Sequence, residues 1–417
     1  MRKLTKLDNG LQIVSHQMPS VKSVAFGVFN NVGSRDETEE INGTAHFLEH
    51  MAFKGTQKRT ALEIAKTIDD VGGVINAYTS EEVTAYYSIL MSEHLHIGVD
   101  IITDILQNSI FEPKEFETER GVILQEIGMY LDTPLRMVHD YWQKTAYPEQ
   151  PIGRLILGKK NIIKSIEREK LIEFMQNNYN PEKMIFTAAG KVNHEEFVDM
   201  VIKSIKNLPK GESKNRVSAN YFGGEYREEK ELEQIHMVLG FKGTDYHDKD
   251  HHALGVYSTL MGTGMSSRLF QEIREKRGLV YSIHSDSDSY SDTGTFQVVA
   301  GTGKNEIKEL LPVLCDELNK STKNLTEDEI NRAKAQMKSS IVMSMESSSS
   351  NAGTSAYQLL RYNKLIEVEE RIKKINNVTK ESIEKVVYKI LKSKPTIASI
   401  GPIDNLETID KIESRFN

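Results

Sequence analysis

The chain has 417 residues, enough for two or more ordinary domains, and its 38% hydrophobic and 27% charged residues are typical of a soluble globular protein. A formal net charge of −7 argues against nucleic-acid binding and favours basic partners. The single cysteine, Cys315, excludes an internal disulfide framework and indicates a reducing compartment, where we expect it to be buried. No run approaches the ~18 apolar residues of a membrane span, and the start lacks signal-peptide features, so we expect a cytoplasmic bacterial protein.

Hydrophobic periodicity in the first half predicts a strand, two helices, a hairpin and two further helices. In chain order these cover residues 22–31, 43–55, 60–71, 72–80 paired with 83–91, 92–108 and 112–131.

The second half repeats this order, which indicates an internal duplication. The expected strand, two helices, strand pair and helix cover residues 234–243, 248–261, 266–276, 278–288 paired with 293–301, and 304–319. A polar stretch at 209–226 has the composition of a linker. We therefore predict an α+β fold of two homologous domains, 1–212 and 227–417, joined by a linker at 213–226, each a mostly antiparallel sheet packed with helices.

The segment "AHFLEHMAFKG" at 45–55 places two histidines and a glutamate in an apolar helical run. On a helix, His46 and His50 lie one turn apart on one face, with Glu49 on nearly the same side. Neutral imidazoles are good zinc ligands, and a carboxylate beside zinc can act as a general base for water. This H-x-x-E-H pattern is the inverzincin motif.

The duplication serves as an internal control for this motif. The stretch "DHHALGVYSTL" overlays "TAHFLEHMAFK", so Gly255 and Val256 stand where the first half has Glu49 and His50. Only the first half keeps the constellation, which indicates one functional site per chain rather than a packing requirement met twice.

A third ligand is expected from the predicted helix 112–131. Glu119 and Glu126 are seven residues apart, so both can face the His helix, one binding metal and the other orienting a histidine. In the second half, a gapped overlay replaces this pair by Ala333 and Ser340. The second half therefore lacks both carboxylates as well as the Glu49 and His50 of the motif.

The whole chain resembles the pitrilysin/insulinase family of zinc peptidases, and within it the bacterial relatives of the mitochondrial processing peptidase β subunit. The resemblance rests on "GSRDE", "GTAHFLEHMAFKGT", "GGVINAYTSEE", "ERGVILQEI" and "SSRLFQEIREKRGLVYS" in this order. It implies one Zn²⁺ per chain held by His46, His50 and Glu126, with Glu49 as base and Glu119 as supporting glutamate.

The resemblance also implies residues that bind and stabilise the substrate. Arg274 and Tyr281, from the second domain, would hydrogen-bond the scissile carbonyl and the developing oxyanion. An extended peptide would add as a strand beside Asn76 and Ala77. Phe53 would line a pocket for an apolar side chain. Asp140 matches one of two arginine-binding acids of the processing peptidase, but Arg136 replaces the other, which weakens any preference for basic presequences.

These residues together predict a zinc-dependent endopeptidase for short unfolded or extended peptides. Two domains make half of the clamshell that family members close around substrate, so we expect a homodimer, and Arg274 and Tyr281 could act within one chain or across the dimer. The alternative is a non-catalytic scaffold like the respiratory-complex core subunits. Such subunits lose the ligand set that this chain keeps.

Overall fold

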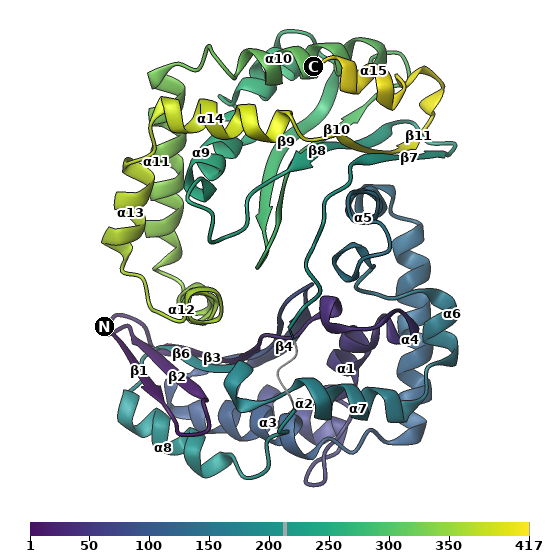
Figure 1. The fold of residues 1–417 in the computed structure, drawn as a ribbon. Coiled ribbons are helices and arrows are strands. Elements are labelled where there is room, and N and C mark those ends of the chain that lie inside the picture. The colour runs from purple at the N-terminus through teal and green to yellow at the C-terminus, as the bar shows by residue number, and fades with distance from the viewer. Residues whose placement is uncertain (212–214, 417) are drawn as a thin grey trace. The chain divides into compact units, whose positions relative to one another are not determined.

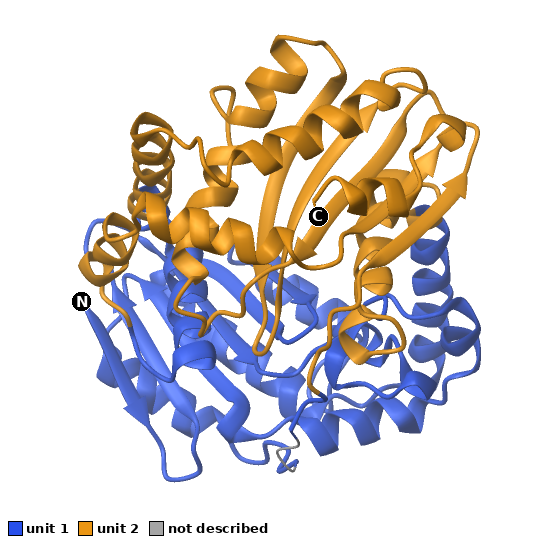
Figure 2. Cartoon of the chain, turned by 45° about the horizontal axis from the view of Figure 1, so that its top comes forward, with its two compact units in different colours: residues 1–129, 154–217, 343–365 blue, residues 130–153, 218–342, 366–417 orange. Residues whose placement is uncertain are grey.

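The computed structural model describes residues 1–211 and 215–416, which form two compact units (Figures 1 and 2). The first unit comprises residues 1–129, 154–217 and 343–365, and the second comprises residues 130–153, 218–342 and 366–417. The predicted boundary between the first domain (1–212) and the linker (213–226) falls at residues 212–214, which lie outside the described residues. That residues 1–212 and 227–417 form the two domains stays a prediction.

The sheet of the first unit has six strands in the order β1-β2-β6-β3-β5-β4, with β2 and β6 parallel and the other pairs antiparallel. Its strands are β1 (Arg2–Lys6), β2 (Gln12–Gln17), β3 (Ser23–Asn30), β4 (Val74–Thr79), β5 (Thr84–Met91) and β6 (Met184–Gly190). Its helices are α1 (Thr44–Ala52), α2 (Ala61–Asp69), α3 (Leu95–Asn108), α4 (Pro113–Leu131, whose last two residues belong to the second unit), α6 (Lys160–Ser165), α7 (Arg168–Asn178), α8 (His194–Ser204) and α12 (Ser348–Tyr362).

Both faces of this sheet are buried, which explains why β3 is apolar over most of its length rather than alternating. On one face, Phe26 and Val28 pack in the main core with Ile102 and Ile105 of α3. On the other face, Phe29 packs beneath α12, whose contributions to this second cluster include Ala356 and Leu359. Figure 1 shows α12 across the strands β3 and β6.

The second unit repeats this architecture. Its sheet has the order β7-β11-β8-β10-β9, again with one parallel pair, β7 with β11. Its strands are β7 (Gly224–Glu229), β8 (Ile235–Lys242), β9 (Val280–Ser289), β10 (Gly294–Thr302) and β11 (Thr396–Gly401). Its helices are α5 (Pro134–Ala146), α9 (His251–Gly262), a π-helix (Phe270–Glu275), α10 (Ile307–Lys320), α11 (Glu327–Ser344, whose last two residues belong to the first unit), α13 (Val368–Asn376), α14 (Lys380–Leu391) and α15 (Ile409–Ser414).

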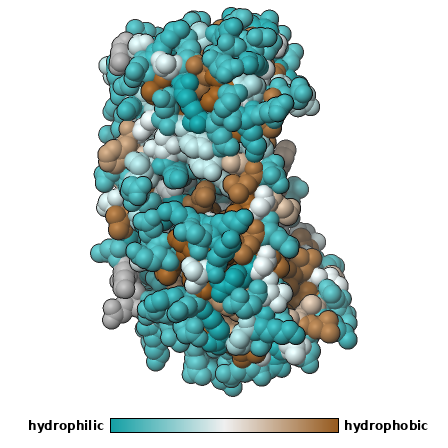
Figure 3. Space-filling model, turned by 90° about the vertical axis from the view of Figure 1, so that its right-hand side faces the viewer, coloured by the Kyte–Doolittle hydropathy of each residue, from teal (hydrophilic) through white to brown (hydrophobic). Residues whose placement is uncertain are grey.

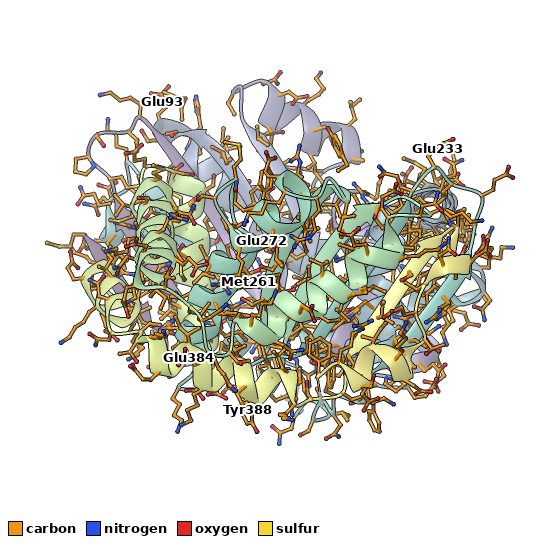
Figure 4. All side chains as sticks on the ribbon, turned by 90° about the horizontal axis from the view of Figure 1, so that it is seen from above. Glu93, Glu233, Met261, Glu272, Glu384 and Tyr388 are labelled. Carbon is orange, nitrogen blue, oxygen red and sulfur yellow. The ribbon has the colours of Figure 1, made fainter. Side chains whose placement is uncertain are left out.

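The strand order β2-β6-β3-β5-β4 matches β7-β11-β8-β10-β9 element for element. This confirms the predicted α+β fold of two homologous halves, each a mostly antiparallel sheet packed with helices. Cys315 is fully buried in the second unit, as expected. Figure 4 labels Met261 of α9, which is 0% exposed, and Tyr388 of α14, which lies at the rim and is 60% exposed.

One feature of the fold could not be read from the sequence: the two halves exchange equivalent helices. The helix α5, from the first half, packs on β7, β8 and β11, where the Trp142 indole N–H donates to the Thr396 carbonyl at 3.0 Å. Its counterpart α12, from the second half, covers β2, β3 and β6 of the first unit. Each sheet is therefore completed by a helix from the other half of the chain, as the colours by residue number show (Figure 1).

The surface is largely hydrophilic on the side drawn in Figure 3, with apolar side chains in small groups. Among the described residues, no helix combines the length and the hydropathy needed to cross a membrane.

Candidate metal centre

The helix α1 carries the two candidate histidine ligands. Its buried face, which includes Phe47, Leu48 and Met51, is part of the main core of the first unit. This packing fixes the rotation of the helix, and His46 and His50, one turn apart, come together with ring centroids 4.7 Å apart.

The third candidate ligand comes from α4, which starts at Pro113, a residue well suited to a first helical turn. Ile123 and Ile127 pack into the same core and turn Glu126 toward α1. The Glu126 Oε2 atom lies 3.6 Å from His46 Nε2 and 3.5 Å from His50 Nε2. In the part of the chain that the structure describes, His46, His50 and Glu126 form the one group of at least three such residues able to hold a metal ion.

The spacing of these atoms fits zinc. With bonds of roughly 2.0–2.1 Å, the ligand atoms of a tetrahedral zinc site lie about 3.4 Å apart. The two imidazole-to-carboxylate distances, 3.5 and 3.6 Å, are close to this edge and longer than an ordinary hydrogen bond. Two imidazoles and one carboxylate also match the donor set of catalytic zinc sites, which leave a fourth position open.

A buried carboxylate holds His50 in the orientation that metal binding needs. The Glu119 side chain, 4% exposed, accepts a hydrogen bond from His50 Nδ1 at 3.0 Å, which leaves Nε2 directed toward Glu126. The Lys54 ammonium lies 2.5 Å from the other Glu119 oxygen. Burial lowers the pKa of His50, but contacts with Glu126 and Glu119 outweigh it and leave the pKa above its ordinary value.

His46 is in a different environment from its neighbour. Burial, helped by the adjacent His50, lowers the pKa of His46 to about 4. The imidazole is therefore neutral at physiological pH, which is the form that binds a metal.

Glu49 lies beside the three ligands without belonging to the converging group. Its Oε2 atom accepts a hydrogen bond from the Thr79 hydroxyl at 2.6 Å. Burial raises the pKa of Glu49, and the Thr79 hydrogen bond opposes this shift. A partly buried carboxyl group with a raised pKa, oriented by one hydrogen bond, is suited to take up and return a proton.

The edge strand β4 carries the predicted peptide-binding residues Asn76 and Ala77. Because β4 pairs only with β5 in the described sheet, its other edge is open to an added strand. Asn76 is exposed and Ala77 buried, and the Asn76 Oδ1 atom accepts from the Ala77 N–H at 2.8 Å. Phe53 ends α1 and packs, partly buried, against the main core.

The remaining predicted residues belong to the second unit. The Arg274 guanidinium stacks over Phe270 at 4.7 Å and over Tyr281 at 5.6 Å, so the structure brings Arg274 and Tyr281 together. Tyr281 is 75% exposed. Burial raises the pKa of Asp140, and a hydrogen bond with Tyr130 opposes this shift.

Sequence reasoning missed two side chains that touch the centre, Thr79 and Lys54. Thr79 follows the predicted strand residues Asn76 and Ala77, and Lys54 belongs to the motif segment itself. The positions of Thr79 and Lys54 in the sequence do not indicate their partners. Thr79 contacts Glu49, 30 residues away, and Lys54 contacts Glu119, 65 residues away.

Comparison with known proteins gives two matches to family models. Residues 12–160 match insulinase (peptidase family M16), and residues 165–337 match the peptidase M16 inactive domain. The second description agrees with the loss of the ligand set from the second half.

Several bacterial proteins named uncharacterized zinc protease are similar over nearly their full length. The one from Rickettsia felis is 38% identical (96% of this chain, 98% of the relative), that from Streptomyces coelicolor 36% (99% and 91%), and that from Bacillus subtilis 35% (97% and 100%).

Solved structures show the same fold. A protease from Helicobacter pylori superposes with a TM-score of 0.89 at 25% identity, covering 96% of this chain and 99% of that one. A chain of Complex III2 from Candida albicans has a TM-score of 0.88 at 18% identity, covering 99% of each chain, and shows a shared fold alone.

Proposed function

Because the chain belongs to the insulinase family of peptidases, M16, whose relatives are named zinc proteases, we propose that it is a zinc-dependent endopeptidase for short, extended peptides. One observation carries the proposal: three ligand atoms converge within 4.8 Å of one another, beside a carboxyl group that is not among them.

His46, His50 and Glu126 would hold one Zn²⁺ per chain. When bound, zinc would supply the Lewis acidity that lowers the pKa of a water molecule toward about 7. Glu49 accepts the proton of that water at its carboxylate and later returns it to the nitrogen of the leaving amine. The Thr79 hydroxyl holds Glu49 Oε2, which leaves Oε1 for the proton.

The peptide would bind as an extra strand along β4, with backbone hydrogen bonds beside Asn76 and Ala77 and an apolar side chain against Phe53. Arg274 and Tyr281 would donate hydrogen bonds to the oxyanion of the tetrahedral intermediate. Their contact with each other orients both groups. The net charge of −7 favours cationic peptides, with Asp140 the candidate for an arginine side chain.

The test is cleavage of a mixed peptide library by the purified protein, with products identified by mass spectrometry. The wild type should cleave, a chelator should stop cleavage, and added zinc should restore it. Glu49→Gln should retain one zinc per chain and cleave at least 1,000-fold more slowly, a loss on the order of that for a central catalytic group. Full activity of Glu49→Gln would refute the assignment of the base.

A matched test concerns the second unit. Arg274→Ala should lower kcat by roughly 100-fold or more, as loss of an oxyanion donor does, without changing zinc content. The non-catalytic scaffold, the alternative reading, predicts instead that zinc-loaded wild type cleaves nothing.

Assembly and location complete the proposal. We expect a cytoplasmic homodimer, which sedimentation velocity at micromolar concentration should detect as a species of twice the chain mass. Mixing Glu49→Gln with Arg274→Ala chains tests cooperation between subunits, because activity returns only if Arg274 acts on the partner's centre.

A further inference from the structure

Glu37 is a buried carboxyl group, 3% exposed, that makes three hydrogen bonds near the start of α1. Its Oε1 atom accepts from the Ala45 N–H at 2.7 Å. Its Oε2 atom accepts from the Gly43 N–H at 2.8 Å and from Asn42 Nδ2 at 3.0 Å. All three donors lie within four residues before His46.

The helix needs this help because it has no cap of its own. The first N–H groups of a helix have no partner within it and are usually satisfied by the side chain of the N-cap residue. The N-cap residue of α1 is Gly43, which has no side chain and a φ of +97°. Glu37, six residues earlier, supplies the missing acceptor, and its negative charge faces the positive end of the helix dipole.

Glu37 is itself anchored by the segment before α6. The Arg154 guanidinium donates to the Glu37 carbonyl at 2.7 Å, and Asn42 Nδ2 also donates to the Leu155 carbonyl at 3.0 Å. Glu37 and Asn42 therefore link the start of α1 to a second, separate part of the first unit.

We propose that Glu37 is a positioning residue for the metal centre, setting the first turn of α1 and with it the direction of the His46 imidazole. The inference rests on the metal centre of the proposed function. His46 lies in this first turn, directly after Ala45, and its Nδ1 atom is buried without a hydrogen-bond partner among the described residues. Because His50 is held by Glu119 and His46 has no such partner, the backbone of the first turn determines where His46 points.

The test measures metal binding without peptide. In Glu37→Gln, an amide NH₂ group replaces one carboxylate oxygen and cannot accept a hydrogen bond from the backbone N–H groups. Zinc affinity, measured by competition with a chromogenic chelator at pH 8, should therefore fall by about 10-fold or more. The visible spectrum of the Co²⁺-loaded protein, which reports ligand geometry, should change as well.

Two further variants keep the test decisive. Asn42→Ala removes one donor but leaves the Glu37 carboxylate, so it should weaken zinc binding less and decides the matter if Glu37→Gln does not fold. Asn193→Ala removes the N-cap of α8, whose side chain accepts from the Glu196 N–H, and serves as the control. It should lower the melting temperature without altering zinc affinity or the Co²⁺ spectrum.

Unchanged zinc affinity and an unchanged Co²⁺ spectrum in folded Glu37→Gln and Asn42→Ala would overturn the proposal. The same effects in Asn193→Ala would also overturn it, because they would show only general loss of stability. If the wild type binds zinc but cleaves no peptide, the proposed function fails while these binding data still decide the role of Glu37.

Discussion

At the scale of single residues, two groups of the candidate centre, His50 and Glu49, each have one atom held by a neighbour and another left for the proposed chemistry. Glu119 accepts a hydrogen bond from His50 Nδ1, so that Nε2 is left for the proposed metal. The Thr79 hydroxyl donates to Glu49 Oε2, so that Oε1 is left for a proton. Such partners reduce the number of orientations that a side chain samples before reaction.

The substitution Thr79→Val tests whether the Thr79 hydrogen bond orients Glu49, the proposed general base. Losing a hydrogen bond to a charged group costs roughly 1.5–3 kcal/mol, so kcat should fall by about 10- to 100-fold while zinc content stays at one per chain. Thr79→Ser keeps the hydroxyl group and should retain most of the activity. Equal kcat values for Thr79→Val and wild type would show that Glu49 needs no help from Thr79.

The raised pKa of Glu37 predicts that the stability of the metal-free protein depends on pH. Burial outweighs its hydrogen bonds and raises the pKa of Glu37 from 4.5 to about 7. The folded state therefore holds this proton more tightly than the unfolded state, so the contribution is complete below pH 4.5 and is lost as pH rises to about 7.

The measurement is the free energy of unfolding of wild type minus that of Glu37→Gln, from urea titrations between pH 4.5 and 8. This difference should fall with rising pH by on the order of 3 kcal/mol. Glu39→Gln, at an exposed position where Lys159 lowers the pKa of the carboxyl group, should give only a small difference of opposite slope. A flat difference for Glu37→Gln would contradict the raised pKa.

At the scale of elements, the start of α1 requires glycine. Gly43 has a φ of +97°, and a Cβ there would lie 2.9 Å from Gly158 Cα and 2.9 Å from the Leu157 carbonyl oxygen. The left-handed conformation and the lack of space both exclude a side chain.

Gly43→Ala should therefore destabilise the first unit by about 2 kcal/mol or more and weaken zinc binding, measured by chemical unfolding and chelator competition. Gly121→Ala, inside α4 where an added Cβ meets nothing within 4 Å, is the matched control and should be neutral or stabilising. If Gly43→Ala is as stable as wild type, the helix start tolerates another conformation.

At the scale of the whole molecule, the exchange of α5 and α12 makes the two halves of the chain interdependent. Without α12, the first sheet would expose the face that carries Val14, Phe29 and Ile185. Without α5, the second sheet would lose the helix that carries Trp142, the single tryptophan of the chain.

Fragments 1–217 and 218–417 should therefore fail to fold separately and form a stable complex when co-expressed. Trp142 reports the outcome, because its fluorescence should be red-shifted in fragment 1–217 alone and return to the wild-type wavelength in the complex. A monodisperse fragment 1–217 that unfolds cooperatively and binds zinc would contradict the prediction.

The sequence alone determined the fold class and the residues of the centre, because local patterns encode both. Helical spacing puts His46 and His50 on one face, seven-residue spacing puts Glu119 and Glu126 on one face, and the duplication showed that the second half lacks the complete set. The fold class and the family are confirmed, whereas the roles of the individual site residues stay predictions.

Only the tertiary structure decided which side chains support these residues and which helix covers which sheet. Thr79, Lys54 and Glu37 reach the centre through contacts between segments far apart in sequence, and no local periodicity encodes such contacts. The same holds for α5 and α12: each has an apolar face that predicts burial, but an apolar face does not specify which of two similar sheets it will cover.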